Sequence, residues 1–181
     1  MKRGCRKAIY PEPLKIVYLS LGTNLGDRLE NIKKALALLQ KIPASIEKIS
    51  PIYESAPVGY ESENFFYNLI VKLRTFYGVE PLFLELKKIE FLMGRKRSTV
   101  VSDRPMDLDI ILYEDTSFKS SLIEVPHPKA WERAFVLLPL LDLEEDLKDP
   151  ISKKSLKEIF EERKNILKEQ KLYRLSLSFT P

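Results

Sequence analysis

The segment MDLDIILYE, residues 106–114, places two aspartates inside a run of apolar residues. Carboxylates are seldom buried in proteins unless they are paired with a cation or bound to a metal ion. Side chains alternate between the two faces of a β-strand, so Asp107 and Asp109 share one face of the predicted strand. The opposite face, which must be the packed one, carries three apolar residues: Leu108, Ile110 and Leu112. The segment therefore predicts a sheet with one dry face and one accessible face that carries two carboxylates.

The residues before this segment predict further strands and a helix. Residues 14–21 are mostly apolar and β-branched or aromatic, which is typical of an inner strand. After a turn indicated by Gly22 and Gly26, Asp27 is expected to cap the start of a helix. The apolar face of this helix is predicted to contain four residues: Leu29, Ile32, Leu36 and Leu39. Residues 45–55 predict a less regular strand, because the proline inside it argues for an edge or a bulge.

A long strand and a second helix are predicted next. Residues 65–76 alternate so that the odd-numbered side chains are apolar and the even-numbered ones, which include Phe66 and Asn68, are more polar. Residues 80–95 predict an amphipathic helix with Pro81 in its first turn. If the strands share one sheet, the aromatic ring, the amide and the two aspartates lie on one surface.

The rest of the chain predicts shorter elements. Residues 116–125 indicate a hairpin, 126–143 a loop and a helix, 155–170 a third helix, and the alternating residues 173–179 an added edge strand. The full order is strand, helix, strand, strand, helix, strand, followed by these additions. This order favours an α+β fold, namely a ferredoxin-like βαββαβ sandwich with both helices on one face of the sheet. The extra C-terminal helix and the possible edge strand would be added to that core.

Length and composition indicate one domain. The 181 residues suit a single compact unit, which we place at residues 14–181 behind a flexible leader, residues 1–13. No apolar run approaches membrane-spanning length, and no apolar stretch of a secretory signal follows the basic N-terminus. The single cysteine, Cys5, excludes an internal disulfide and fits the cytoplasm. The net charge of +4 is spread along the chain, which argues against a nucleic-acid partner. We further expect small-molecule partners, no membrane and a monomer.

The two aspartates also have the spacing of a magnesium site. Mg²⁺ prefers oxygen ligands and keeps water and substrate phosphates in its shell. Nearby segments supply groups that bind phosphate: Arg95, Arg97, Arg104, Arg133 and the only histidine, His127. Phosphoryl-transfer sites use such combinations to spread the charge of the transition state. Simpler explanations exist for each part, because Asp107 can pair with Arg104 alone, and Phe66 and Phe135 can belong to the core.

Taken in order, several segments resemble those of the 6-hydroxymethyl-7,8-dihydropterin pyrophosphokinases of folate biosynthesis. The segments are YLSLGTNLGDRLENI, SPIYESAPVG with NFFYNLIV, IEFLMGRKR, DRPMDLDIILY and VPHPKAWERAFVLLPL, between about residue 16 and residue 142. The most specific pattern is Arg-x-x-Asp-x-Asp, here Arg104, Asp107 and Asp109. The resemblance implies an ATP- and Mg²⁺-dependent enzyme that transfers pyrophosphate from ATP to the hydroxymethyl group of a reduced pterin and leaves AMP.

The resemblance also implies roles for the residues of the site. Asp107 and Asp109 would bind two Mg²⁺ ions between ATP and the pterin hydroxyl group. Phe66 and Phe135 would stack on the two faces of the pterin. The edge of the pterin would be held by Asn68 and by the backbone near Ser55 and Val58.

The nucleotide would be held by basic and polar residues around the same strand. By resemblance they are Lys87, Glu90, Arg95, Arg97, Arg104, Ile110, His127 and Arg133. Of these, Arg95 and Arg104 are expected to stabilise charge during transfer, and no general base is assigned. The chain departs from the family in the loop before the aspartates, which usually ends in a Trp-Gly-Pro-Arg type sequence. Here it reads VVSDRP, without Trp and one residue shorter, which leaves open how the loop closes over the pterin.

Two other functions stay open at this point. An RNA-binding module of the same topology would use exposed aromatic residues of the sheet and a basic surface. Two aspartates on the open face would repel phosphate in the absence of a metal, which argues against that module. A different Mg²⁺-dependent nucleotide enzyme, such as a nucleotidyltransferase, would differ in its products. It would release pyrophosphate, whereas the pyrophosphokinase would give AMP and a pterin diphosphate.

Overall fold

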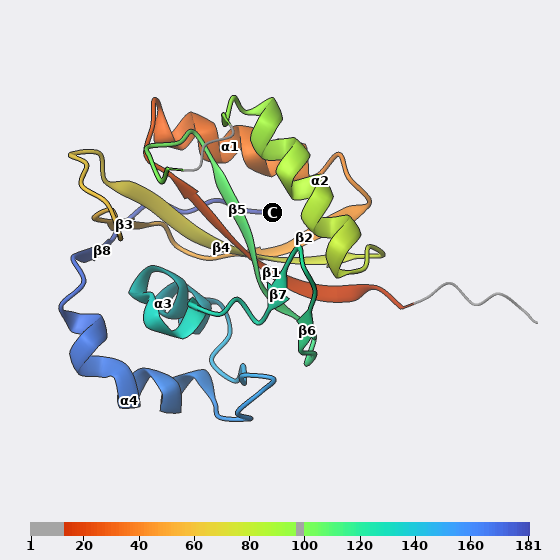
Figure 1. The fold of residues 1–181 in the computed structure, drawn as a ribbon, viewed down its shortest axis with the longest axis vertical. Coiled ribbons are helices and arrows are strands. Elements are labelled where there is room, and N and C mark those ends of the chain that lie inside the picture. The colour runs from red at the N-terminus through yellow and green to blue at the C-terminus, as the bar shows by residue number, and fades with distance from the viewer. Residues whose placement is uncertain (1–12, 97–99) are drawn as a thin grey trace, which may run out of the picture.

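The computed structural model describes residues 13–96 and 100–181, and Figure 1 shows a sheet with helices against both of its faces. The strands of the main sheet are β1 (Lys15–Thr23), β2 (Ala44–Ile49), β3 (Tyr53–Ser55), β4 (Phe66–Thr75), β5 (Asp107–Tyr113) and β8 (Leu172–Arg174). A hairpin consists of β6 (Phe118–Lys119) and β7 (Glu124–Val125). The helices are α1 (Arg28–Leu39), α2 (Val79–Leu92), α3 (Ala134–Leu143) and α4 (Leu156–Lys168), with a 3₁₀ turn at Ala130–Glu132. The leader predicted at residues 1–13 lies outside the described residues, except for Pro13.

The strands β1 and β4 form the centre of the sheet. β1 pairs antiparallel with β4 on one side and with β5 on the other, and β2 and β3 share the second edge of β4. β8 extends the sheet beyond β3, so that the order is β5–β1–β4–β3–β8. The described residues therefore have a mixed fold of helices and an antiparallel sheet, which agrees with the predicted α+β class. In this part of the chain, no helix has both the length and the apolar character needed to cross a membrane.

The irregular strand predicted at residues 45–55 is divided into β2 and β3. Between them Pro51 has no N–H group to offer to the ladder of β4. Ser50 takes over this connection, because its backbone N–H donates to Ile70 O at 2.9 Å and its hydroxyl accepts from Ile70 N at 2.8 Å. The proline thus divides the segment into two strands, where the sequence predicted one strand with an edge or a bulge.

The helices α1 and α2 cover one face of the sheet and enclose a first core (Figure 1). Asp27 caps α1, since its carboxylate accepts a hydrogen bond from Glu30 N at 3.0 Å. All four residues predicted for the apolar face of α1 join this core: Leu29, Ile32, Leu36 and Leu39. Pro81 lies in the first turn of α2, where its missing N–H group costs no helical hydrogen bond. Both predicted helices of the βαββαβ order are therefore confirmed.

The helices α3 and α4 cover part of the opposite face and enclose a second core (Figure 1). α3 is almost wholly apolar and packs Leu137 and Leu140 into the same buried cluster as Ile70 of β4. α4 begins with a reciprocal cap, in which Ser155 N donates to the Glu158 carboxylate at 2.7 Å and Glu158 N donates to the Ser155 hydroxyl at 3.2 Å. The accessible face predicted by the sequence is therefore reduced to the part that these helices leave open.

The alternation predicted for β5 breaks after Ile110. Leu19 and Tyr18 of β1 pair with Ile110 and Leu112, so Ile111 is an extra residue that forms a β-bulge. As a result, Ile111 and Leu112 both belong to the second core. The prediction that placed Leu112 in the core beneath α1 and α2 is therefore wrong. The two aspartates precede the bulge and keep their common face.

The C-terminal tail forms less strand than its alternation predicts. β8 pairs with β3, and beyond it single backbone hydrogen bonds join Leu175 N to Ile52 O and Ile52 N to Leu177 O. Leu175 and Phe179 pack against the first core, whereas Tyr173 and Leu177 are 56% and 44% exposed. Since β3 has only three residues, a longer edge strand finds no partner beside it.

Two tyrosine–carboxylate pairs fasten the C-terminal end of α3 to the sheet. Tyr18 donates to Glu144 Oε2 at 2.6 Å, and the buried Lys72 ammonium lies 2.8 Å from the same oxygen. Tyr53 of β3 donates to Asp142 Oδ2 at 2.6 Å. Burial alone would raise the pKa of Glu144, but the bonds from Lys72 and Tyr18 outweigh burial and hold this pKa below its ordinary value. These bonds fix α3 over the sheet and so help to place the residues at its other end.

Glu144→Ala is expected to lower the free energy of unfolding by about 1–3 kcal/mol at pH 7, because the buried Lys72 ammonium and Tyr18 hydroxyl lose their partner. Glu145→Ala is the matched control, since Glu145 pairs with Lys157 on the surface and its loss should change stability little. Urea unfolding followed by circular dichroism measures both changes.

The effect of Glu144→Ala should also depend on pH. Because the folded pKa of Glu144 is depressed, its contribution is complete above its ordinary pKa of 4.5 and is lost as the pH falls through the folded value. The difference in unfolding free energy between wild type and variant should therefore shrink in acid. A difference that stays constant far below pH 4.5 would contradict this assignment.

Candidate functional site

The part of the sheet that α3 leaves uncovered forms the floor of a pocket. The pocket is lined by Ser20, Gly22, Ser55, Ala56, Val58, Tyr60, Phe66, Asn68, Arg104, Asp107, Asp109, Arg133 and Phe135. Its volume of about 100 Å³ is small beside the roughly 300–1,000 Å³ of typical ligand pockets. The Arg104 side chain narrows it, with the guanidinium carbon 5.0 Å from the centre of the Phe66 ring. The pocket brings the predicted carboxylates and the predicted aromatic rings together.

The register of the central strands places polar groups side by side on the pocket floor. Gly22 of β1 pairs with Asn68 of β4 on one side and with Asp107 of β5 on the other. A Cβ atom at Gly22 would lie 3.3 Å from Asn68 Oδ1, so a larger residue here would push against the Asn68 side chain. Gly22 therefore belongs to the strand and not to the predicted turn, which forms at Gly26 with φ of +76°.

Asn68 and Ser55 form a buried polar pair at one side of the pocket. Asn68 is 3% exposed, and its Nδ2 donates to Ser55 Oγ at 2.9 Å and to Tyr53 O at 3.4 Å. Both bonds use the amide nitrogen, so the Asn68 oxygen, which accepts no hydrogen bond within the described residues, remains available to a ligand. Phe66 lines the pocket from the sheet and the half-buried Phe135 lines it from the first turn of α3. The pocket thus offers an aromatic ring from each of two layers.

The two aspartates of β5 differ in their surroundings. Asp107 is bound by two arginines: Arg95 contacts Oδ1, and the Nε and Nη2 atoms of Arg104 lie 2.9 and 2.7 Å from Oδ2. Asp109 accepts no hydrogen bond from the residues that the structure describes, and Lys87 Nζ lies 3.9 Å from its Oδ1. The side chains of Asp107 and Asp109 are 19% and 32% exposed. Both predicted carboxylates therefore open onto the pocket, but one of them is already neutralised.

The pKa values of the pair follow from this difference. Burial raises the pKa of Asp109, and the charge of Asp107 raises it further. Burial would raise the pKa of Asp107 as well, but Arg104 and Arg95 outweigh burial and hold it below its ordinary value. Asp109 is thus an under-compensated carboxylate, which an added cation would stabilise in its charged form.

Glu90 and Lys87, both expected to contact ATP, connect α2 with β5 behind the pocket. Glu90 is 4% exposed, and its Oε1 accepts hydrogen bonds from Lys87 Nζ at 2.6 Å and from Leu108 N at 2.7 Å. Its Oε2 lies 2.8 Å from Arg95 Nη1. Burial raises the pKa of Glu90 in spite of these cations. Neither residue lines the pocket; Glu90 holds Arg95 in place beside Asp107.

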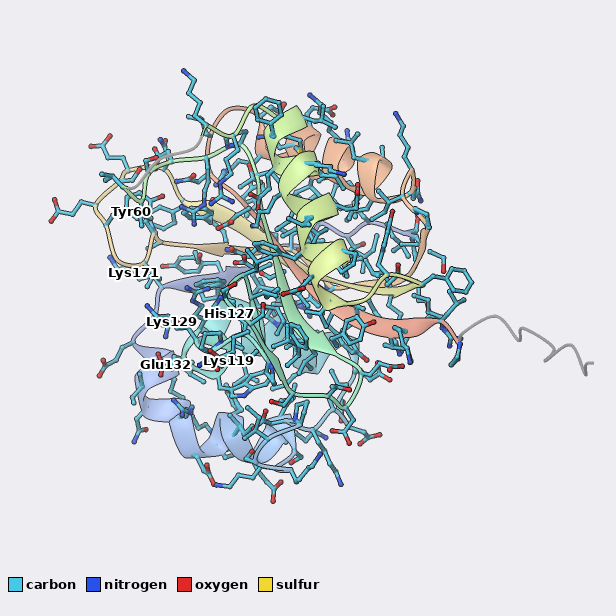
Figure 2. The ribbon with its side chains drawn as sticks, turned by 45° about the vertical axis from the view of Figure 1, so that its right-hand side comes forward. Tyr60, Lys119, His127, Lys129, Glu132 and Lys171 are labelled. Carbon is cyan, nitrogen blue, oxygen red and sulfur yellow. The ribbon has the colours of Figure 1, made fainter. Side chains whose placement is uncertain are left out.

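Two predicted basic residues come from the segment between β7 and α3. Arg133 lines the pocket, with its guanidinium carbon 5.7 Å from the centre of the Phe135 ring. His127, labelled in Figure 2, donates from its backbone N to β5 at 3.1 Å, and its Nδ1 accepts from Lys129 N at 3.1 Å. Burial lowers the pKa of His127, although the charge of Asp109 opposes this shift.

Three other residues predicted to contact a substrate differ in their position relative to the pocket. Val58 lines the pocket and is 57% exposed. Ile110 is 2% exposed and lies in the first core, so its side chain does not reach the pocket, and an adenine contact through its backbone stays a prediction. Arg97 lies outside the described residues.

The aspartate pair supplies the acidic oxygen atoms that line this pocket. Within residues 13–96 and 100–181, no cluster of three or more His, Cys, Asp or Glu side chains is placed to hold a metal ion. Mg²⁺ commonly takes one or two carboxylates and completes its shell with water and substrate phosphates. A pair of oxygen donors that includes the under-compensated Asp109 fits Mg²⁺ bound together with a polyphosphate.

Residues 18–145 match the family model described as 7,8-dihydro-6-hydroxymethylpterin-pyrophosphokinase (HPPK). The chain belongs to the HPPK family. It is 42% identical over 142 residues to the 2-amino-4-hydroxy-6-hydroxymethyldihydropteridine pyrophosphokinase of Aquifex aeolicus, covering 78% of this chain and 88% of that protein. It is 39% identical over 129 residues to the protein of the same name from Bacillus subtilis, covering 71% and 77% of the two chains. The chain is therefore a pyrophosphokinase, a transferase that uses ATP.

The fold of this chain is similar to part of a longer protein. The match is to a crystal structure of a triple mutant of Plasmodium falciparum HPPK-DHPS with SDX-DHP, at a TM-score of 0.72 and 18% identity. It covers 91% of this chain and 48% of the longer one, so this chain spans about half of that protein. At this identity the likeness concerns the fold alone.

Several residues in or next to the pocket were missed in the prediction: Ser20, Asn24, Tyr60 and Asp103. Ser20 lies on the same face of β1 as Gly22 and pairs with Asp109, a pairing that the sequence alone does not give. Tyr60, labelled in Figure 2, and Asp103 come from loops, where no periodic pattern relates neighbours in space. Their contacts depend on the assembled sheet.

Proposed function

We propose that this pocket is where the chain transfers pyrophosphate from ATP to the hydroxymethyl group of 6-hydroxymethyl-7,8-dihydropterin, giving AMP and the pterin diphosphate for folate biosynthesis. The observation that carries the proposal is the common face of β4 and β5. Phe66 and Asn68 line the same pocket as Asp107 and Asp109. A flat ring and a polyphosphate would be bound next to each other, which pyrophosphoryl transfer requires.

The pterin would lie between Phe66 and Phe135. A reduced pterin is planar and has hydrogen-bond donors and acceptors around its edge, so two aromatic faces and a polar rim suit it. The free oxygen of Asn68 and the backbone near Ser55 and Val58 would bind that edge. The side chain of Arg104 would have to leave the face of Phe66 for the ring to enter.

The two aspartates would hold two Mg²⁺ ions together with water and phosphate oxygens. Bound there, Mg²⁺ would offset the phosphate charge and orient the pterin hydroxyl toward the β-phosphorus of ATP. Asp109 would bind a metal ion more readily than Asp107, because no described side chain donates a hydrogen bond to Asp109. Asp107 becomes available when Arg95 or Arg104 gives up its contact, and phosphate oxygens offer these arginines an equivalent partner.

The nucleotide would lie along β5 and the segment that follows β7. The residues proposed to contact it are Lys87, Glu90, Arg95, Arg97, Arg104, Ile110, His127 and Arg133. Arg95 and Arg104 would move from Asp107 to the transferring group and stabilise its charge. Glu90 would contribute by holding Arg95 from behind. The substrate hydroxyl is the nucleophile, so no side chain has to form a covalent bond.

We also propose the finer points of the sequence-based description. The sheet with α1 and α2 corresponds to a ferredoxin-like βαββαβ unit, to which α3, α4 and β8 are added. Residues 14–181 form one domain that acts as a monomer on small molecules in the cytoplasm, without a nucleic-acid or membrane partner. The even spread of charged residues argues against a nucleic-acid partner, and the single cysteine fits the cytoplasm.

Incubation of the protein with ATP, Mg²⁺ and 6-hydroxymethyl-7,8-dihydropterin is expected to produce AMP and the pterin diphosphate in equal amounts, measured by chromatography. Omission of Mg²⁺ should abolish both products. Release of free pyrophosphate would indicate nucleotidyl transfer, and unchanged ATP would contradict the proposal altogether.

Asp109→Ala is expected to lower kcat by at least about 100-fold, because the open metal ligand is lost. The free energy of unfolding should stay equal or rise. Asp109 makes no hydrogen bond within the described residues, so no such bond offsets the cost of burying its charge. Rates of AMP formation and urea unfolding measure the two effects. Asp115→Ala is the control, because the exposed Asp115 pairs with Lys153 away from the pocket. A wild-type rate for Asp109→Ala would remove Asp109 from the mechanism.

Phe135→Ala is expected to raise the Kd of the pterin by about 10–100-fold, because one of the two stacking faces is lost. The Kd of ATP should change less than about threefold. Calorimetric titrations measure both constants, with Phe91→Ala as the control, since Phe91 is 73% exposed on α2. Equal losses for the two substrates would exclude a stacking role.

A further inference from the structure

One carboxylate, that of Asp103, joins the segment before β5 to two other loops. Its Oδ1 accepts hydrogen bonds from Asn24 Nδ2 at 2.7 Å and from the Tyr60 hydroxyl at 3.1 Å. Its Oδ2 accepts from the Ser62 hydroxyl at 2.9 Å and from the side-chain amide of Asn64. The donors come from the β1–α1 segment and from the β3–β4 loop. Asp103 therefore holds together three segments that are far apart in the sequence.

Asn24 binds the same segments through its backbone and its side chain. Its N–H donates to Arg104 O at 3.2 Å, and its Oδ1 accepts from Arg104 N at 2.9 Å. Its Nδ2 also lies 3.0 Å from the Tyr60 hydroxyl and 3.1 Å from Asn64 O. Asn24 is 3% exposed, so its own hydrogen bonds are buried, whereas Asn64 lies on the surface. The backbone of Arg104 is thereby tied to the β3–β4 loop.

These contacts adjoin the proposed pterin pocket. Ala56, Val58 and Tyr60 of the β3–β4 loop line the pocket, and Arg104 lines it from the segment before β5. Figure 2 shows Tyr60 on this loop. Tyr60 therefore belongs to the pocket wall, and its hydroxyl binds Asp103. Asp103 itself does not line the pocket, so it can act on a ligand only through these neighbours.

The chemistry of the contacts requires a carboxylate. All four donors are uncharged, and their bonds, led by that of Asn64, hold the pKa of Asp103 below its ordinary value. Asp103 is therefore ionised at neutral pH, and each bond is charge-assisted, which makes it about twice as strong as a neutral hydrogen bond. An asparagine at this position would turn N–H groups toward two of the donors.

We propose that Asp103 is a positioning residue for pterin binding, which holds the β3–β4 loop and the backbone of Arg104 in their binding arrangement before a ligand arrives. The inference rests on the proposed function of the pocket. The segment between β3 and β4 has no helix or strand of its own, so ordering it at the moment of binding would cost affinity. Contacts made in advance remove that cost.

Asp103→Asn tests the inference, and Asp115→Asn, the same change at a remote exposed carboxylate, is the matched control. With Mg²⁺ and a saturating non-hydrolysable ATP analogue, the calorimetric Kd of 6-hydroxymethyl-7,8-dihydropterin should rise about tenfold. The Kd of the ATP analogue alone should change less than about twofold, because the Arg104 side chain, which would contact the nucleotide, is not among the groups that donate to Asp103. In the ligand-free protein, amide hydrogen exchange of residues 56–65 should become about tenfold faster. Asp115→Asn should leave all three quantities unchanged.

Two results would overturn the inference. One is a folded Asp103→Asn variant with wild-type pterin affinity and wild-type exchange of the loop. The other is a proportional loss of affinity for both substrates, which is the pattern of a general structural role. If Asp103→Asn does not fold, the Ser62→Ala variant tests the inference instead. Ser62 donates a hydrogen bond to Asp103 but does not line the pocket. The variant should raise the pterin Kd about threefold and quicken exchange, and no change would overturn the inference.

Failure of the proposed function would be visible separately. It would appear as the absence of AMP formation by the wild-type protein. Loop exchange in the ligand-free variants needs no substrate and would still show whether Asp103 holds the loop.

Discussion

The pairing of β1 with β5 is the constraint on which the site depends. It sets Asp107 opposite Gly22 and Asp109 opposite Ser20, and both of these residues are too small to cover a carboxylate. The other face of the same strands is packed against α1 and α2, so the acidic side chains can only face the pocket. Two such charges repel each other unless cations are close. The arginines neutralise one of them, and the other is left for a ligand.

In the proposed mechanism the same arginines serve two partners. Arg95 and Arg104 balance Asp107, and they are also the groups best suited to phosphate. Movement of these side chains from Asp107 to ATP would expose the second metal ligand only when the nucleotide is present. Glu90 stays bound to Arg95 from the far side, so this arginine keeps a partner throughout. In this proposal, nucleotide binding would be coupled to completion of the metal site.

The regular parts of this site could be predicted because side chains in strands repeat with a fixed period. That period placed Phe66 and Asp107 on one face before any pairing was known. The period misplaced Leu112, because the β-bulge before this residue arises from the pairing with β1 and leaves no signal within β5 itself. The contact between Tyr60 and Asp103 spans 43 positions of the sequence and joins two loops, so only the folded chain brings it about. The Trp-less loop before β5 is secured by this carboxylate, which sequence similarity did not indicate.

The most direct test of the central claim is to locate the bound cation. Mn²⁺ can replace Mg²⁺ and broadens the NMR signals of nearby amides, and a non-hydrolysable ATP analogue would keep the nucleotide in place. The account predicts that the amide signals of Ser20, Gly22, Asp107 and Asp109 broaden first as Mn²⁺ is added. Broadening that begins at other acidic residues, such as those at 144–146, while the signals of β5 persist would contradict it.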